Sequence, residues 1–118
     1  MRIVRYKTFF GETFDDIKKR LKGIETDDEF DIVLLNEHSA CLLEVKSKGK
    51  NLKISKFLKK AKAFRLNFPK YKDHKIYLGL AALVFDAKTE EKCIKKGIAV
   101  IKQVGDNVVI NYEHLKAY

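Results

Sequence analysis

The architecture of this chain is decided by residues 29–46, which read EFDIVLLNEHSACLLEVK. Residues 29–36 and 40–46 are each rich in apolar and β-branched side chains, and a polar segment lies between them. This pattern predicts two antiparallel strands joined by a turn at 36–39. Apolar residues fall on both faces of the pair, so we predict that it lies near the centre of a sheet.

The register of this hairpin brings charged residues together. A two-residue turn at 37–38 would place Asp31 directly opposite Glu44, with Cβ atoms about 4.5–5.5 Å apart. Lys46 would follow on the same face, opposite Glu29. A four-residue loop keeps this register, whereas a three-residue loop breaks it.

Two facing carboxylates in a central hairpin call for a physical explanation. They repel each other, and their burial without partners is costly. A divalent cation removes both problems, because Mg²⁺ binds one or two protein carboxylates and completes its shell with water and phosphate oxygens. A neighbouring lysine can orient or deprotonate a water and balance charge on a phosphate. The pattern therefore indicates metal-assisted phosphodiester hydrolysis. The alternative is an ordinary surface pair of Glu44 and Lys46, because EVK is a common tripeptide.

The rest of the chain alternates between strand and helix patterns. Residues 14–22 fit both a helical stripe and the alternation of a strand. Beyond the hairpin, we predict a helix at 51–67, a strand at 75–84, a helix at 87–96, and strands at 98–104 and 107–112. This order predicts a single α/β domain spanning residues 1–118, with a mixed sheet and flanking helices.

Composition narrows the function classes. The chain has 118 residues, of which 46% are hydrophobic, and 25 Lys and Arg against 16 Asp and Glu give a net charge of +9. No apolar run is long enough to cross a membrane, and the first ten residues do not resemble a secretory signal, so we expect a cytoplasmic protein without membrane partners. Cys41 and Cys93 lie in apolar patterns and are predicted to be buried, reduced thiols; no cysteine–histidine spacing suggests zinc.

Beyond these patterns, the chain carries a family resemblance. The segments EFDIVLLN, ACLLEVKSKGK, KIYLGLAAL and GIAVIKQVGDNVVI, with a basic helix between the second and third, occur in an order similar to that of the PD-(D/E)xK nuclease superfamily. Within it, the chain resembles a group of uncharacterised bacterial proteins. The resemblance covers residues 14–118 and implies a restriction-endonuclease-like αβββαβ core, with 14–22 as the first strand.

The resemblance also implies roles for particular residues. Asp31 and Glu44 would bind Mg²⁺, with Mn²⁺ as a substitute, and the Val45 carbonyl would be a further ligand. Lys46 would be the catalytic lysine. Members usually begin with a helix that carries an acidic residue near the metal. Only residues 1–13 precede the first strand here, so that helix is expected to be short or missing. Glu12 could stand in for the acid, or it is a surface residue.

Positive charge is concentrated after the hairpin, where residues 46–75 contain twelve bases and one acid. We expect phosphate contacts from the basic residues in and before the predicted helix, namely Lys48, Lys53, Lys56, Lys59, Lys60 and Arg65. Lysines contact phosphates without reading bases, so binding would be sequence-tolerant and salt-sensitive. The alternative is a solvated helix face.

Two further polar residues are candidates for accessory roles. Glu29 would lie opposite Lys46. Gln103 would lie near the site, or it satisfies backbone groups at the last hairpin, which is the interpretation that we favour.

The sequence therefore predicts a Mg²⁺-dependent nuclease domain acting on nucleic acid, with DNA as the expected substrate. Two alternatives stay open. One is an inactive nuclease-fold domain that binds nucleic acid. The other is a protein-interaction module, including a homodimer paired through the edge of the final hairpin.

Overall fold

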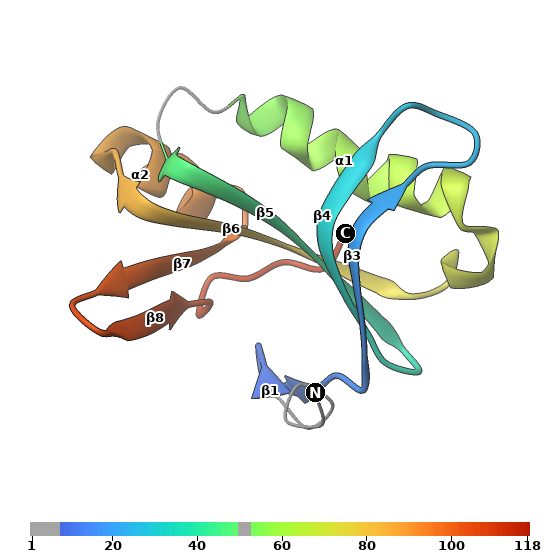
Figure 1. The fold of residues 1–118 in the computed structure, drawn as a ribbon, viewed down its shortest axis with the longest axis horizontal. Coiled ribbons are helices and arrows are strands. Elements are labelled where there is room, and N and C mark those ends of the chain that lie inside the picture. The colour runs from blue at the N-terminus through green and yellow to red at the C-terminus, as the bar shows by residue number, and fades with distance from the viewer. Residues whose placement is uncertain (1–7, 50–52) are drawn as a thin grey trace.

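The computed structural model describes residues 8–49 and 53–118. Within them, the chain forms an α/β fold with a mixed six-stranded sheet and two α-helices (Figure 1). The sheet has the order β3-β4-β5-β6-β7-β8. Its strands are β3 (Asp16–Lys22), β4 (Glu29–Leu35), β5 (Ser39–Gly49), β6 (Lys75–Phe85), β7 (Ala99–Val104) and β8 (Asn107–Asn111). β5, β6 and β7 run parallel, and the other neighbouring pairs are antiparallel.

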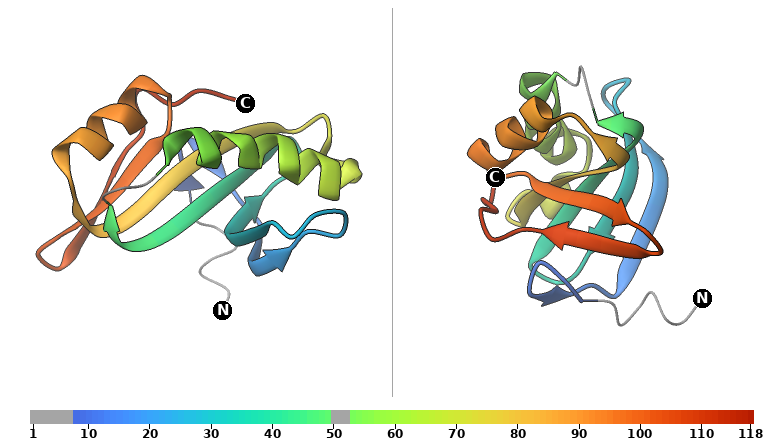
Figure 2. Two further views of the ribbon diagram at one scale, coloured as in Figure 1. Left: turned by 90° about the horizontal axis from the view of Figure 1, so that it is seen from above. Right: turned by 90° about the vertical axis from the view of Figure 1, so that its left-hand side faces the viewer.

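The two helices supply the crossovers between the parallel strands. α1 (Ile54–Asn67) joins β5 to β6, and α2 (Ala87–Lys95) joins β6 to β7. Both lie on the same side of the sheet (Figure 2). α1 buries an apolar stripe with helical spacing, made of Ile54, Phe57, Ala61 and Phe64. This stripe packs against the large core cluster on that face of the sheet.

On the opposite face of the sheet lie the first described residues of the chain and Leu115. β1 (Thr8–Phe9) and β2 (Glu12–Thr13) form a small antiparallel pair of their own. Phe10 and Phe14 are buried there in a second core cluster with Leu34 and Leu43, and Leu115 packs against it. The short 3-10 segment η2 (Pro69–Tyr71) follows α1.

Most of the predicted elements are confirmed. The ambiguous segment 14–22 contains a strand, β3, and the described residues before it form β1 and β2 rather than a helix. The helix predicted at 51–67 begins at Ile54; residues 51 and 52 lie outside the described part of the chain. Cys41 and Cys93 are buried free thiols, as predicted. Among the described residues, no helix is both long and apolar enough to cross a bilayer.

One local break in the sheet bears on the site. Phe30 packs in the helix-side cluster together with Val33, although regular alternation would place it on the other face, beside Ile32. The neighbouring strand breaks at the same level, because Arg20 has a φ of 51° and does not pair with Asp31. A positive φ is uncommon for an arginine. Both strands therefore change face around Asp31.

Candidate functional site

The candidate site lies where β4 and β5 separate. Their ladder runs from Leu35↔Ala40 to Ile32↔Leu43, which confirms the predicted register. Beyond it, β4 continues along β3 as far as Glu29, while β5 continues along β6 as far as Gly49. Asp31 lies on one branch of this fork, and Glu44 and Lys46 lie on the other.

The predicted direct pairs at the end of the hairpin are wrong in detail. Asp31 and Glu44 are not ladder partners, and Glu29 pairs with Lys22 instead of Lys46. The Asp31 carboxylate accepts a hydrogen bond from the backbone N–H of Val45, at 2.9 Å. The break in alternation at Asp31 accounts for this hydrogen bond. The Asp31 carboxylate, rather than a backbone carbonyl of β4, accepts from Val45 where the two strands separate.

Glu44 has two cationic neighbours. Its side chain is only 14% exposed, and both of its oxygens lie 3.3 Å from the Lys60 Nζ. The Lys46 Nζ lies 3.9 Å from Glu44 Oε1 and is closer to solvent. Lys60 also donates a hydrogen bond to the Glu29 carbonyl, and its ammonium lies 5.5 Å from the centre of the Phe30 ring. Lys60 therefore compensates the half-buried charge of Glu44.

This arrangement fits a magnesium ion in part. Asp31 and Glu44 supply two carboxylates, which is what Mg²⁺ commonly takes from a protein, and the Val45 carbonyl lies on the chain between them and Lys46. Glu44 already holds a cation, the Lys60 ammonium, at 3.3 Å. Among the described residues there is no group of three or more His, Cys, Asp or Glu side chains that could hold a metal. Water and phosphate oxygens would have to complete the shell.

A small apolar hollow of about 160 Å³ lies beside Lys46. Val45, Ala81 and Leu83 contribute to its wall, and Gln103 lies at the same hollow. The Gln103 side chain donates a hydrogen bond to the Gly105 carbonyl at 3.1 Å. Gln103 thus satisfies the hairpin backbone, which is the interpretation that we favour, and its nearness to the Asp31–Glu44 pair stays a prediction.

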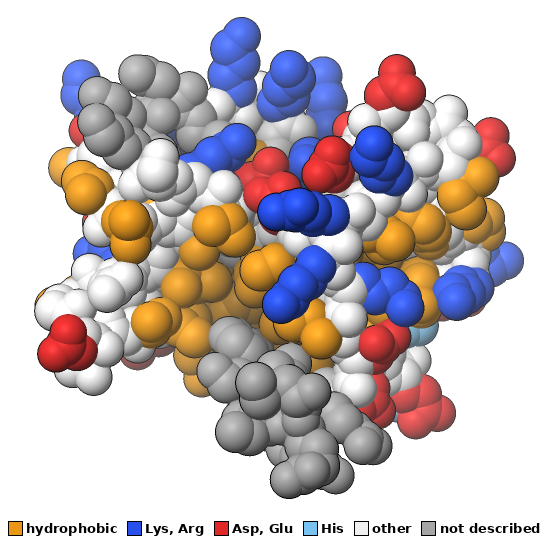
Figure 3. Space-filling view, viewed as in Figure 1, with side chains coloured by type: hydrophobic (Ala, Val, Ile, Leu, Met, Phe, Trp, Pro, Cys, Tyr) orange, Lys and Arg blue, Asp and Glu red, His pale blue; other side chains and the backbone are white. Residues whose placement is uncertain are grey.

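The predicted phosphate-contacting residues divide into two groups. Lys53, Lys56 and Lys59 are exposed, and Lys and Arg side chains gather above α1 in Figure 3. Lys60 instead turns toward Glu44. Arg65 donates hydrogen bonds to three backbone carbonyls, those of Lys72, His74 and Tyr118, which gives it a structural role. The side chain of Lys48 lies outside the described part of the structure.

Sequence reasoning did not single out a second set of lysines. Lys92, Lys95 and Lys96, at the end of α2, border a hollow of about 250 Å³ with Ser55 and Leu58 of α1. The two basic helices therefore meet on one side of the sheet. The bases at 92, 95 and 96 follow helical spacing, and this was the available signal.

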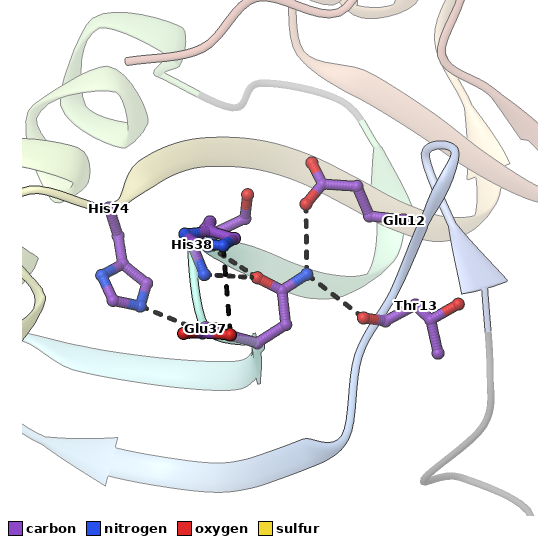
Figure 4. A network of polar contacts seen from close by, with 7 residues as sticks. Glu12, Thr13, Glu37, His38 and His74 are labelled. Atoms are coloured by element: carbon purple, nitrogen blue, oxygen red, sulfur yellow. Dashed lines mark hydrogen bonds and ion pairs between the residues drawn. The ribbon is translucent and has the colours of Figure 1, made fainter.

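Glu12 lies far from the fork, in a polar network at the turn end of β4 and β5 (Figure 4). The Asn36 amide donates to Glu12 at 3.1 Å, and Asn36 is five strand residues, or about 17 Å, from Asp31. Burial by itself raises the pKa of the Glu12 carboxyl. Hydrogen bonds and a nearby ammonium outweigh burial and hold the pKa below its ordinary value; they come from Ser39, Asn36, Tyr77 and Lys75. Glu12 is thus an anchor for β2 rather than a member of the Asp31–Glu44 pair.

Comparison with known proteins found no matching family model, no similar curated protein and no similar solved structure.

Proposed function

We propose that this protein is a metal-dependent phosphodiesterase of the PD-(D/E)xK type, acting on nucleic acid. The observation that carries the proposal is the fork between β4 and β5. It gathers two carboxylates and a lysine at the point where two paired strands separate. A buried sheet offers few other places where such groups can meet and still reach a polymer in solvent.

The order of elements supports the same proposal. Three consecutive antiparallel strands, a helix and a parallel strand form the sequence β3, β4, β5, α1, β6. This order is compatible with the βββαβ part of the restriction-endonuclease-like core that the resemblance implies. The candidate residues lie on its second and third strands, as expected for that core.

In this proposal, Asp31 and Glu44 hold Mg²⁺ together with the Val45 carbonyl. Bound there, Mg²⁺ would supply Lewis-acid stabilisation of the phosphate oxygens. The Val45 N–H fixes the Asp31 carboxylate at 2.9 Å, so one ligand is positioned before any ion arrives. Lys60 holds the Glu44 carboxylate and limits its movement.

Lys46 is the residue that would act on the reacting groups. Its side chain is 44% exposed, so its ammonium can reach a phosphate. It would orient the attacking water and balance the negative charge that grows on the phosphate as the new P–O bond forms. The exposed lysines of α1 and α2 would hold the polymer backbone, with DNA as the proposed substrate.

The test is plasmid nicking with Mg²⁺ or Mn²⁺. We expect Lys46→Ala to reduce the rate by about 100-fold or more, because it removes a charge aimed at the transition state. Lys70→Ala is the matched control, since Lys70 is an exposed lysine that borders a hollow with Glu12 at the turn end of the sheet, and its removal should leave the rate nearly unchanged. Equal cleavage by the wild type and Lys46→Ala would contradict the assignment of Lys46.

A second candidate is a nucleic-acid-binding domain without catalysis. The pairing of Glu44 with Lys60 and Lys46 favours it, because Glu44 is already compensated by two ammonium groups. In that case, neither metal produces nicking above that of a heat-denatured sample, while DNA binding persists in Lys46→Ala.

A further inference from the structure

The two edges of the six-stranded sheet are unlike. β3, at one edge, reads DIKKRLK and includes the left-handed Arg20. Charges and irregular backbone are the usual protection of a sheet edge against pairing with another chain. β8, at the other edge, reads NVVIN and carries no charge. No further strand of the described chain pairs with the outer side of β8.

The side chains of β8 are also unusually apolar for an edge. Val108 is 65% exposed and Val109 is 44% exposed. They lie on opposite faces, because Val108 borders the hollow beside Lys46 while Val109 is the ladder partner of Lys102. An approaching strand would therefore meet aliphatic side chains on both faces of the sheet.

Exposed apolar side chains concentrate around this edge. Of the ten large hydrophobic residues exposed in the described part of the chain, four lie on β7, on β8 or just beyond β8, namely Val104, Val108, Val109 and Tyr112, and three lie further in on β5 and β6, namely Val45, Leu83 and Val84. In Figure 3, hydrophobic side chains gather to the left of and below the centre of the face, and Lys or Arg side chains lie at the centre and along the top, over α1. Apolar patches of this kind on a polar surface mark interaction sites.

We propose that β8 pairs with β8 of a second copy of this chain, so that two sheets join into one continuous sheet. Its free N–H and C=O groups specify a strand as the occupant. Because β8 carries no charge, the strand that fits beside it is β8 of another copy. Binding of a nucleic acid along β8 would require exposed lysine or arginine side chains, and β8 has none. Two molecules of net charge +9 can approach each other most closely at surfaces that carry no charge.

Symmetry favours closure into a dimer. A two-fold axis perpendicular to the sheet makes the two β8 strands antiparallel and brings the same patch together from both copies. Val109, the central residue of β8, then lies at or beside the axis. Pairing of β8 with β3 of another copy would instead produce an open filament, and the lysines and the Arg20 break of β3 oppose it.

The first test is the mass of the whole protein in solution, by sedimentation at several concentrations. We expect a dimer whose dissociation constant rises by about tenfold or more in Val108→Lys and in Val109→Lys. Leu66→Lys is the matched control, because Leu66 is 58% exposed on α1, away from the edge. A wild-type protein that stays monomeric at every concentration would overturn the proposal, as would a dimer that is unaffected by both edge substitutions.

The second test does not depend on destabilising the interface. Cys41 and Cys93 are fully buried, so a cysteine introduced at the surface would be the reactive thiol. Val109→Cys should form an oxidised, covalent dimer with one disulfide across the axis, whereas Leu66→Cys should not. No preference for Val109→Cys over Leu66→Cys under the same mild oxidant would count against pairing through β8. A dimer that forms only with DNA would assign the contact to the nucleic acid instead.

Discussion

At the scale of single residues, each carboxylate of the fork has a partner of its own in place of the predicted contact between Asp31 and Glu44. The Asp31 carboxylate accepts a hydrogen bond from the Val45 N–H, and the Glu44 carboxylate forms an ion pair with Lys60. Each carboxylate thus has a partner of its own, and neither is left to repel the other in a half-buried site.

The Glu12 carboxyl gives a residue-scale prediction on pH. Its pKa is lowered from the ordinary value of 4.5, so its contribution to stability is fully present above pH 4.5 and is lost as the pH falls through the folded-state pKa. At neutral pH we expect Glu12→Gln to lower the free energy of unfolding by about 1 kcal/mol. The difference from the wild type should shrink below pH 4.5.

The measurement is urea unfolding of both proteins between pH 7 and acid pH. Glu113→Gln is a control, because Glu113 is exposed near the C-terminus. A difference that grows rather than shrinks in acid would contradict the role given to the carboxylate.

At the scale of elements, the loop between β3 and β4 is tied to the end of α1. Asn67 is buried, and its Oδ1 accepts from the backbone N–H groups of Glu25 and Thr26 at 2.6 and 3.0 Å. Its amide donates to the Thr26 hydroxyl and to the Ala63 carbonyl. Gly23 is needed there, because a Cβ would come within 2.6 Å of the Asn67 oxygen. This contact holds the end of α1 against the loop between β3 and β4, the strand that carries Asp31.

Asn67→Ala should therefore destabilise the fold by roughly 2–3 kcal/mol, since it leaves two backbone N–H groups without their acceptor. Asn107→Ala, at an exposed position at the start of β8, should change stability by less than about 0.5 kcal/mol. Chemical denaturation measures both. Hydrogen exchange adds a local readout, because the amides of Glu25 and Thr26 should lose protection. Unchanged exchange at these amides would contradict the contact.

At the scale of the whole molecule, charge and apolar surface are separated. The lysines of α1 and α2 meet on one side of the sheet, and the uncharged β8 forms one edge. The positive charge of these lysines therefore does not oppose the proposed contact between two copies at β8. A dimer joined there would carry both basic surfaces on the same side of one continuous sheet.

This separation predicts how DNA binding responds to charge reversal. Lys56→Glu with Lys59→Glu should weaken binding by about tenfold or more and make its salt dependence shallower, because fewer counterions are released. Lys70→Glu with Lys72→Glu is the matched control, because both lysines are exposed beyond the C-terminal end of α1, and its effect should be much smaller. Fluorescence anisotropy at several salt concentrations measures both. Equal losses in the two variants would indicate non-specific attraction to the whole protein.

Local patterns were enough to predict β4 to β8, the two helices and the β4–β5 register, whereas they left residues 14–22 open between a helix and a strand. The reason is that strand alternation and helical periodicity depend only on residues close together in the sequence, and the length of a short turn fixes the register of a hairpin. The same reasoning could not place Lys60 against Glu44 or turn Asp31 to the Val45 N–H. Those contacts depend on where α1 crosses the sheet and where two strands change face. Only the tertiary structure decides them, because packing of α1 against β6 sets the position of Lys60, and the β3–β4 break sets the direction of Asp31.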